Sequence, residues 1–148
     1  MINDTMRMHG AATLQLIKAN GEVEVTHKDN LIVDVGFDFI ADCIGKSSGR
    51  PAIMKYVGIG SSSAAVSASN TALGSQLTRR SGAYSHTAGT KTFTIVETFP
   101  PGSGTGAIQE AGVFNASSGG TMFDRVTFPV INKGSDDTLT VTFTFTMS

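Results

Sequence analysis

The last ten residues before the C-terminal serine alternate between apolar and polar side chains. Threonine occupies every second position from 138 to 146, and the apolar positions between are Leu139, Val141, Phe143, Phe145 and Met147. Successive side chains of a strand point to opposite faces. This period of two therefore predicts a strand with one buried and one solvated face. Residues 92–99 show the same pattern, with Phe93, Ile95 and Phe99 on one face.

A hairpin is predicted near the N-terminus. Residues 13–18 and 22–26 flank Asn20-Gly21, the pair best suited to the positive φ angles of a two-residue type I′ turn. In the second strand we expect Val23 and Val25 to point inward, with the polar residues between them facing water.

One helix is predicted near 34–44. The apolar residues at 33, 37, 40, 41 and 44 fall on one helical face. Asp34 stands at the position of an N-cap, and Gly45 stands where a helix would end. Asp34, Asp38 and Asp42 form a second stripe, which we interpret as a solvated face; a metal site is the alternative, although no histidine lies at a matching spacing.

Further short strands are predicted over 54–60, 107–115 and 122–131, the last two paired across a turn at 116–120. Residues 61–70 read as a loop of small residues, and 71–77 as a turn of helix or an irregular crossing. The sequence thus predicts an all-β fold, a two-sheet, jelly-roll-like sandwich of about eight strands. We expect residues 1–10 to form an N-terminal arm and 11–148 a single domain.

Composition agrees with this fold class and narrows the function. Gly, Thr and Ser make up about a third of the 148 residues, as expected for short strands joined by many turns. The net charge of −1 gives no basic field for nucleic-acid binding. No apolar run is long enough to span a membrane, and no signal peptide is recognisable. The single cysteine, Cys43, cannot form an internal disulfide, consistent with folding in a reducing cytosol.

A search for reactive groups predicts no enzyme, cofactor or metal centre. The histidines at 9, 27 and 86 are scattered, and Cys43 reads as a structural thiol within the helix. Gly58 and Gly60 read as points of close backbone approach rather than a phosphate loop. Glu110 shares a face with apolar residues, so it needs a partner, which Arg125 or Lys133 could supply in a structural ion pair.

Arg79 and Arg80 are the only adjacent arginines in the chain. No aromatic residues or wider basic patch accompany them, which disfavours nucleic-acid binding. A contact with a partner protein suits them better, because arginine is enriched in protein interfaces.

Three blocks of the chain resemble a known family. They are Asn30–Ala41, then Tyr56–Ser61 running into Ser69–Arg79, and finally Ile108–Asn115 leading through Gly120–Arg125 to the closing threonine- and phenylalanine-rich strand. In this order the blocks resemble small jelly-roll structural proteins of tailed bacteriophages, the capsid decoration (cement) proteins, some of which are described as tail-associated. The resemblance covers residues 30–146.

The resemblance implies a structural protein of the virion, made in the host cytoplasm and located on the capsid exterior. Such a protein would form a homo-oligomer, a dimer or trimer, and bridge neighbouring copies of the major capsid protein. The candidate capsid contacts are Met6, Arg7 and Met8 in the arm, followed by Arg79 and Arg80. The alternative is a tail, fibre or baseplate component; a carbohydrate-binding sandwich would require exposed aromatic residues that the pattern does not predict.

Overall fold

The computed structural model describes residues 5–148, and its fold is all-β with one helix. The strands are β1 (Met8–Ile17), β2 (Val23–Ile32), β3 (Tyr56–Gly60), β4 (Gln76–Ser81), β5 (Ala83–His86), β6 (Thr92–Phe99), β7 (Gly106–Phe114), β8 (Met122–Lys133) and β9 (Thr138–Met147). The helix α1 spans Asp34–Gly45. The predicted all-β class with one helix is confirmed, with nine strands in place of about eight.

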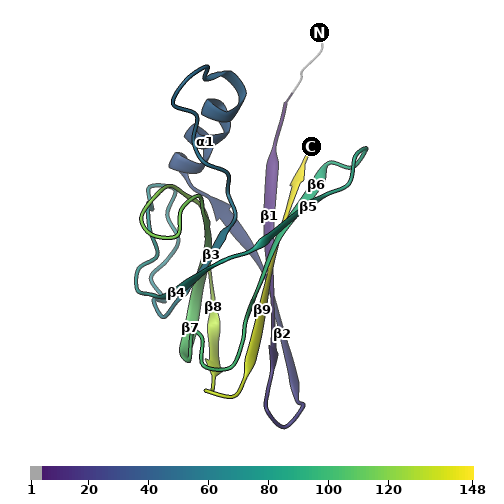
Figure 1. Cartoon of the computed structure of the whole chain (residues 1–148), viewed down its shortest axis with the longest axis vertical. Helices are drawn as coiled ribbons and strands as arrows, with labels where there is room; N and C mark the ends of the chain where they lie inside the picture. The colour runs from purple at the N-terminus through teal and green to yellow at the C-terminus, as the bar shows by residue number, and fades with distance from the viewer. Residues whose placement is uncertain (1–4) are drawn as a thin grey trace.

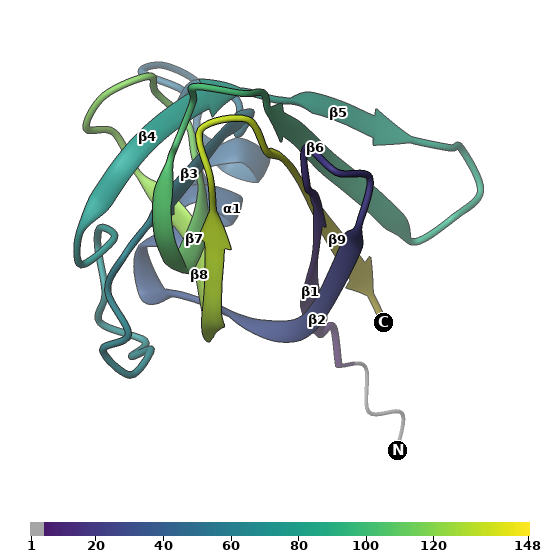
Figure 2. The same ribbon diagram turned by 90° about the horizontal axis from the view of Figure 1, so that it is seen from below.

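The nine strands form one antiparallel sheet that folds at two corners into two layers. Their order is β4-β3-β7-β8-β2-β1-β9-β6-β5. Strand β2 passes from one layer to the other, because Val23–Asn30 pair with β1 whereas Leu31 and Ile32 pair with β8. Seen from below, the strands run round a nearly closed ring (Figure 2).

Gly82 makes the other corner. It alone separates β4 from β5, which lie at opposite ends of the strand order. A Cβ at this position would lie 2.8 Å from the carbonyl oxygen of Val96. A residue without a side chain therefore allows one continuous segment to pair first with β3 and then with β6.

The core lies between the two layers and is built from the alternating strands. In β9, Leu139, Val141, Phe143 and Phe145 are fully buried while the threonines between them are partly exposed. The predicted inward residues Ile95 and Phe99 of β6 are also buried. Strands β4 and β5 were not predicted, because neither QLTRRS nor AYSH shows an apolar alternation.

The hairpin β1–β2 is confirmed, but its predicted turn and inner face are wrong. Lys18 N–H donates to the Glu22 carbonyl at 2.8 Å, and Gly21 N–H donates to the Lys18 carbonyl at 2.9 Å. Gly21 has φ +91°, whereas Asn20 is not in the positive-φ region, so the loop has three residues and a glycine bulge. The extra residue places Val23 and Val25 on the outer face, where they are exposed.

The helix occupies the predicted residues but packs on a different face. Phe37 and Ile44 are exposed, as is Ala41, while Phe39, Ile40 and Cys43 turn toward the body of the protein. Gly36 explains the rotation: a Cβ there would lie 2.3 Å from the Phe123 carbonyl oxygen, so the absence of a side chain lets the β8 backbone approach α1 closely at this residue. Asp34 is the first helical residue and not the N-cap, which is Val33 and makes no side-chain cap.

The helix, the start of β1 and the end of β9 lie together at one end of the molecule, and the β1–β2 hairpin projects from the other (Figure 1). Arg7 and Ser148 exchange two backbone hydrogen bonds, and β1 then pairs with β9 from Met8 onward. Residues 8–10 of the expected arm thus belong to the sheet, and residues 1–4 lie outside the described part of the chain.

A candidate protein-docking groove

An open apolar groove of about 500 Å³ lies at the end of the molecule that carries α1. Its floor comes from the sheets, where Ile95 and Phe123 are buried and Phe93 is half-buried. Phe93 stacks on Phe145 with ring centroids 5.0 Å apart. Packed rings below the groove make a firm floor, because aromatic side chains have few rotatable bonds and interdigitate tightly.

The walls come from segments far apart in the sequence. The helix contributes Phe39, Ile40, Cys43 and Ile44, and the segment after it contributes Ile53 and Met54. Tyr84 of β5 stands on the opposite wall beside Phe93, with ring centroids 5.8 Å apart. The remaining lining residues are Met6, Met8 and Met147.

Four large apolar side chains on the rim remain in contact with water. Ile44 is 76% exposed, Met6 71%, Ile53 69% and Tyr84 59%. Single exposed apolar residues are ordinary, but a contiguous apolar cluster around a hollow marks an interaction site. This arrangement can bury apolar side chains of another molecule.

The side chains that line the groove are almost all apolar. Cys43 and the Tyr84 hydroxyl are its reactive groups among the lining residues, and none of the lining residues within 5–148 is charged. Within residues 5–148, no group of three or more His, Cys, Asp or Glu is arranged to hold a metal ion. The aspartates of the α1 stripe lie along its outer side, where Asp42 and Lys46 form an exposed ion pair of 3.8 Å.

Met6 and Met8, two of the candidate capsid contacts in the expected arm, both line the groove. Arg7 between them bonds through its backbone to Ser148, the residue after β9. Sequence reasoning missed the rest of the site. Ile44 was assigned to the buried helix face and Ile53 to no element, and only the fold shows that these residues and Tyr84 line one hollow.

Arg79 and Arg80 lie on β4, outside the groove. The guanidinium carbon of Arg79 lies 3.5 Å from the centroid of the Phe114 ring. Its Nη1 donates to the carbonyls of Ala116 and Gly119, so Arg79 holds the β7–β8 turn in place. Arg80 is less constrained: its Nε lies 3.5 Å from Glu97 Oε1, and its side chain is 43% exposed. A capsid contact at these two residues stays a prediction.

The predicted buried ion pair of Glu110 is confirmed, and its partner is Arg125. Nε of Arg125 donates to Glu110 Oε1 at 3.1 Å, and the side chains are 2% and 0% exposed. Lys133, the other candidate, instead donates to the Pro100 carbonyl at 3.1 Å.

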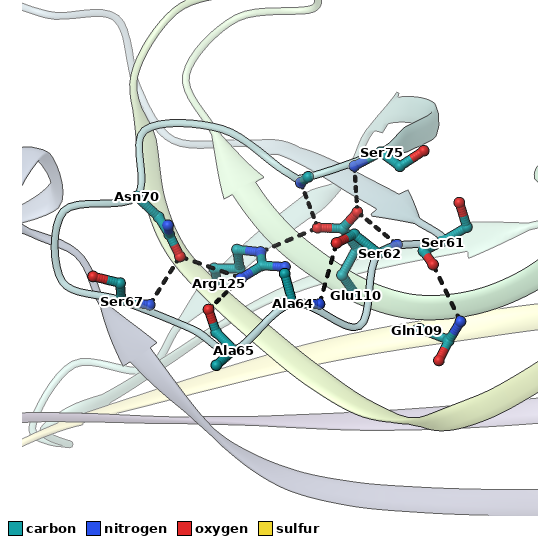
Figure 3. A network of polar contacts seen from close by, with 11 residues as sticks. Ser61, Ser62, Ala64, Ala65, Ser67, Asn70, Ser75, Gln109, Glu110 and Arg125 are labelled. Carbon is teal, nitrogen blue, oxygen red and sulfur yellow. Dashed lines mark hydrogen bonds and ion pairs between the residues drawn. The ribbon is translucent and has the colours of Figure 1, made fainter.

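This ion pair anchors the loop between β3 and β4 (Figure 3). Glu110 accepts backbone N–H groups from Ser62, Gly74 and Ser75, at 3.1, 2.7 and 2.7 Å. Arg125 reaches the Asn70 side-chain oxygen at 3.2 Å. A carboxylate with this many internal donors has a structural role, since buried charges need pairing and hydrogen bonds.

Gly60 is needed beneath the same loop. A Cβ there would lie 2.4 Å from the Ser75 carbonyl oxygen and 2.5 Å from Glu110 Oε2. Together with Gly58, against which the Phe114 ring and Leu73 pack, this confirms that the two glycines mark close approach of the backbone.

Comparison with known proteins returns no match to a family model, a curated protein or a solved structure. No helix within residues 5–148 is both long enough and apolar enough to cross a membrane.

Proposed function

We propose that this chain is a structural protein of a tailed-bacteriophage virion, a capsid decoration protein that docks on the outer capsid surface through its apolar groove. The observation that carries the proposal is the cluster of exposed apolar residues on the groove rim, Met6, Ile44, Ile53 and Tyr84. Such a surface is suited to receive a protein segment, because burying one large apolar side chain contributes about 1.5–3 kcal/mol.

The resemblance of residues 30–146 to phage decoration proteins supports this choice of partner. Its first block, Asn30–Ala41, corresponds to the end of β2 and most of α1, the helix that walls the groove. On this proposal the occupant is an apolar segment of the major capsid protein, exposed on the assembled shell.

Weak contacts suffice for such a function. A protein that binds only the assembled lattice stabilises that lattice by mass action. Where one oligomer contacts several capsid subunits, each modest contact is strengthened by the high effective concentration of the others. The rigid β scaffold and its solvent-facing apolar rim meet these requirements without any catalytic group.

Cosedimentation tests the location. The purified protein is mixed with expanded shells assembled from the major capsid protein of the phage that encodes it, and with purified tails in parallel. The proposal expects saturable binding to shells, with greater resistance of the shells to heat. Binding to tails alone would instead favour the tail, fibre or baseplate alternative, and binding to neither would contradict a virion role.

Substitutions at the rim test the groove itself. Ile44→Asp and Ile53→Asp place charges on residues that are already exposed, so the free energy of unfolding should change little. Each should weaken shell binding at least tenfold, because docking would have to bury the new carboxylate. Val130→Asp is the matched control, since Val130 is an exposed apolar residue of β8 outside the groove. Equal binding by all four proteins would remove the groove from the docking surface.

A further inference from the structure

Strand β2 has a long edge that pairs with no other strand of the described chain. Residues Val23–Asn30 pair with β1 on one side, while contact with β8 on the other side is limited to Leu31 and Ile32. Among the described residues, Val23–Lys28 therefore have no strand on their second side, and most of their side chains are exposed on both faces. Such an edge is a ready template for another strand.

The hydrogen-bond pattern shows which backbone groups are free. The Lys18 N–H donates to the Glu22 carbonyl at the turn end of the ladder, and hydrogen-bonded positions recur at every second residue from there. Even-numbered residues of β2 thus bond to β1, whereas the N–H and C=O groups of Val23, Val25, His27 and Asp29 point to the open side.

Two of the other edges, those of β8 and β5, carry features by which proteins block strand addition. The outer edge of β8 contains Pro129, which has no N–H, and its pairing with β7 is irregular between Ile108 and Glu110. The β5 strand is only four residues long. In contrast, Val23–Asn30 contain neither proline nor glycine, and their register with β1 is unbroken.

The charged side chains of β2 indicate which strand is complementary to this edge. When two copies of β2 pair antiparallel about a two-fold axis at Thr26, Glu24 lies opposite Lys28 of the partner subunit, and the relation repeats on the other side of the axis. Sliding the strands by four residues either way would oppose Glu24 with the partner's Glu24, or Lys28 with the partner's Lys28. Within one protomer Glu24 already contacts Lys18 at 3.1 Å, so pairing would place it between two cations.

We propose that the protein forms a two-fold homodimer by antiparallel pairing of β2 with β2 of a second copy, centred on Thr26. The free groups of Val25 and of the partner's His27 then bond to each other, and the layer β2-β1-β9-β6-β5 continues across the axis into the second copy. This inference rests on the β2 edge alone and is independent of what the groove binds.

Charge exchange tests the register. Sedimentation velocity over a range of protein concentrations should show a monomer–dimer equilibrium for the wild type. Glu24→Lys and Lys28→Glu alone should each raise the dimer dissociation constant at least tenfold, and the double variant should restore it. A wild type that is monomeric throughout, or a dimer that both single variants leave unchanged, would overturn the proposal.

Two further variants separate edge pairing from a folding defect. Val25→Pro removes an N–H on the open side and leaves the bonds from β2 to β1 in place, so it should abolish the dimer while circular dichroism stays native. In a Cys43→Ser background, Thr26→Cys should form an intermolecular disulfide under mild oxidation, because facing non-hydrogen-bonded residues lie about 4.5 Å apart. Gln15→Cys, exposed on the neighbouring β1, is the control. Crosslinking at residue 15 but not at 26 would contradict the proposed interface.

Discussion

Asp124 is a buried acid whose hydrogen-bond partners are all neutral. Its carboxylate is fully buried, accepts the Val113 N–H at 3.0 Å and the Asn30 side-chain amide, and has no cation beside it among these partners. Burial raises the pKa of Asp124 well above its ordinary value near 3.8, and the two hydrogen bonds only partly oppose this. The folded protein therefore holds this proton more tightly than the unfolded chain.

The pH dependence of stability should reveal that proton. The contribution of Asp124 to the free energy of unfolding is complete below its ordinary pKa and decreases as pH rises toward the raised pKa, because the folded state must then bury a charge. Asp124→Asn should lose this decrease. Urea unfolding at several pH values checks it: the difference between wild type and variant should change with pH. Parallel curves would show that Asp124 does not titrate in the folded state.

The buried Glu110–Arg125 ion pair should contribute to the stability of the folded protein. Glu110→Gln leaves the Arg125 charge buried without its partner, and the free energy of unfolding should fall by about 3–5 kcal/mol. The double variant Glu110→Gln/Arg125→Met removes both charges and should recover part of that loss. Both variants should increase proteolysis within residues 61–75, whose backbone Glu110 holds. Equal stability of the single variant and the wild type would contradict the structural role.

At the scale of elements, the strands with strict alternation were predictable and the turns between them were less so. The buried and solvated faces of β9 could be predicted from its sequence, because strict alternation places all apolar side chains on one face of a strand and all threonines on the other. The β1–β2 hairpin was predicted, yet its inner face was wrong because Asn20-Gly21 forms part of a three-residue loop. One extra loop residue exchanges the faces of a whole strand.

The groove could not be predicted from the sequence, because it depends on how α1 and the neighbouring segments are oriented. The helical pattern at 33, 37, 40, 41 and 44 assumed packing on its most apolar side, but Gly36 sets the contact with β8 and turns Ile44 outward. Ile53 and Tyr84 come from segments without a periodic pattern. Only the tertiary fold places these residues around one hollow, whereas the Glu110–Arg125 pair was foreseeable because a charge on an apolar strand face needs a partner.

Paired substitutions in β9 test the assignment of its faces. Phe143→Ala removes a fully buried ring that lies 6.1 Å from the Phe145 ring, and should lower the free energy of unfolding by about 3–5 kcal/mol. Thr142→Ala, one residue away on the partly exposed face, should change it by less than about 1 kcal/mol. Chemical denaturation measures both. Comparable losses would mean that β9 is buried on both faces.

In the whole molecule, the apolar groove and the open edge of β2 lie in different places. The groove lies at the end with α1 and the Arg7–Ser148 contact, while the open edge of β2 extends along the hairpin toward the opposite end (Figure 1). A dimer formed through β2 would therefore leave both grooves free. Two grooves on one dimer would allow contact with two capsid subunits, the arrangement expected of a protein that bridges a lattice.

Site-specific photo-crosslinking from the groove tests directly whether the groove docks on the capsid. A benzophenone amino acid replaces Ile53, which is on the rim, or Val130, which is outside the groove, and the protein is irradiated on assembled shells. Docking through the groove should give a crosslink from residue 53 to the major capsid protein, identified by mass spectrometry, and little or none from residue 130. Efficient shell binding with a crosslink from residue 130 and none from residue 53 would contradict docking through the groove.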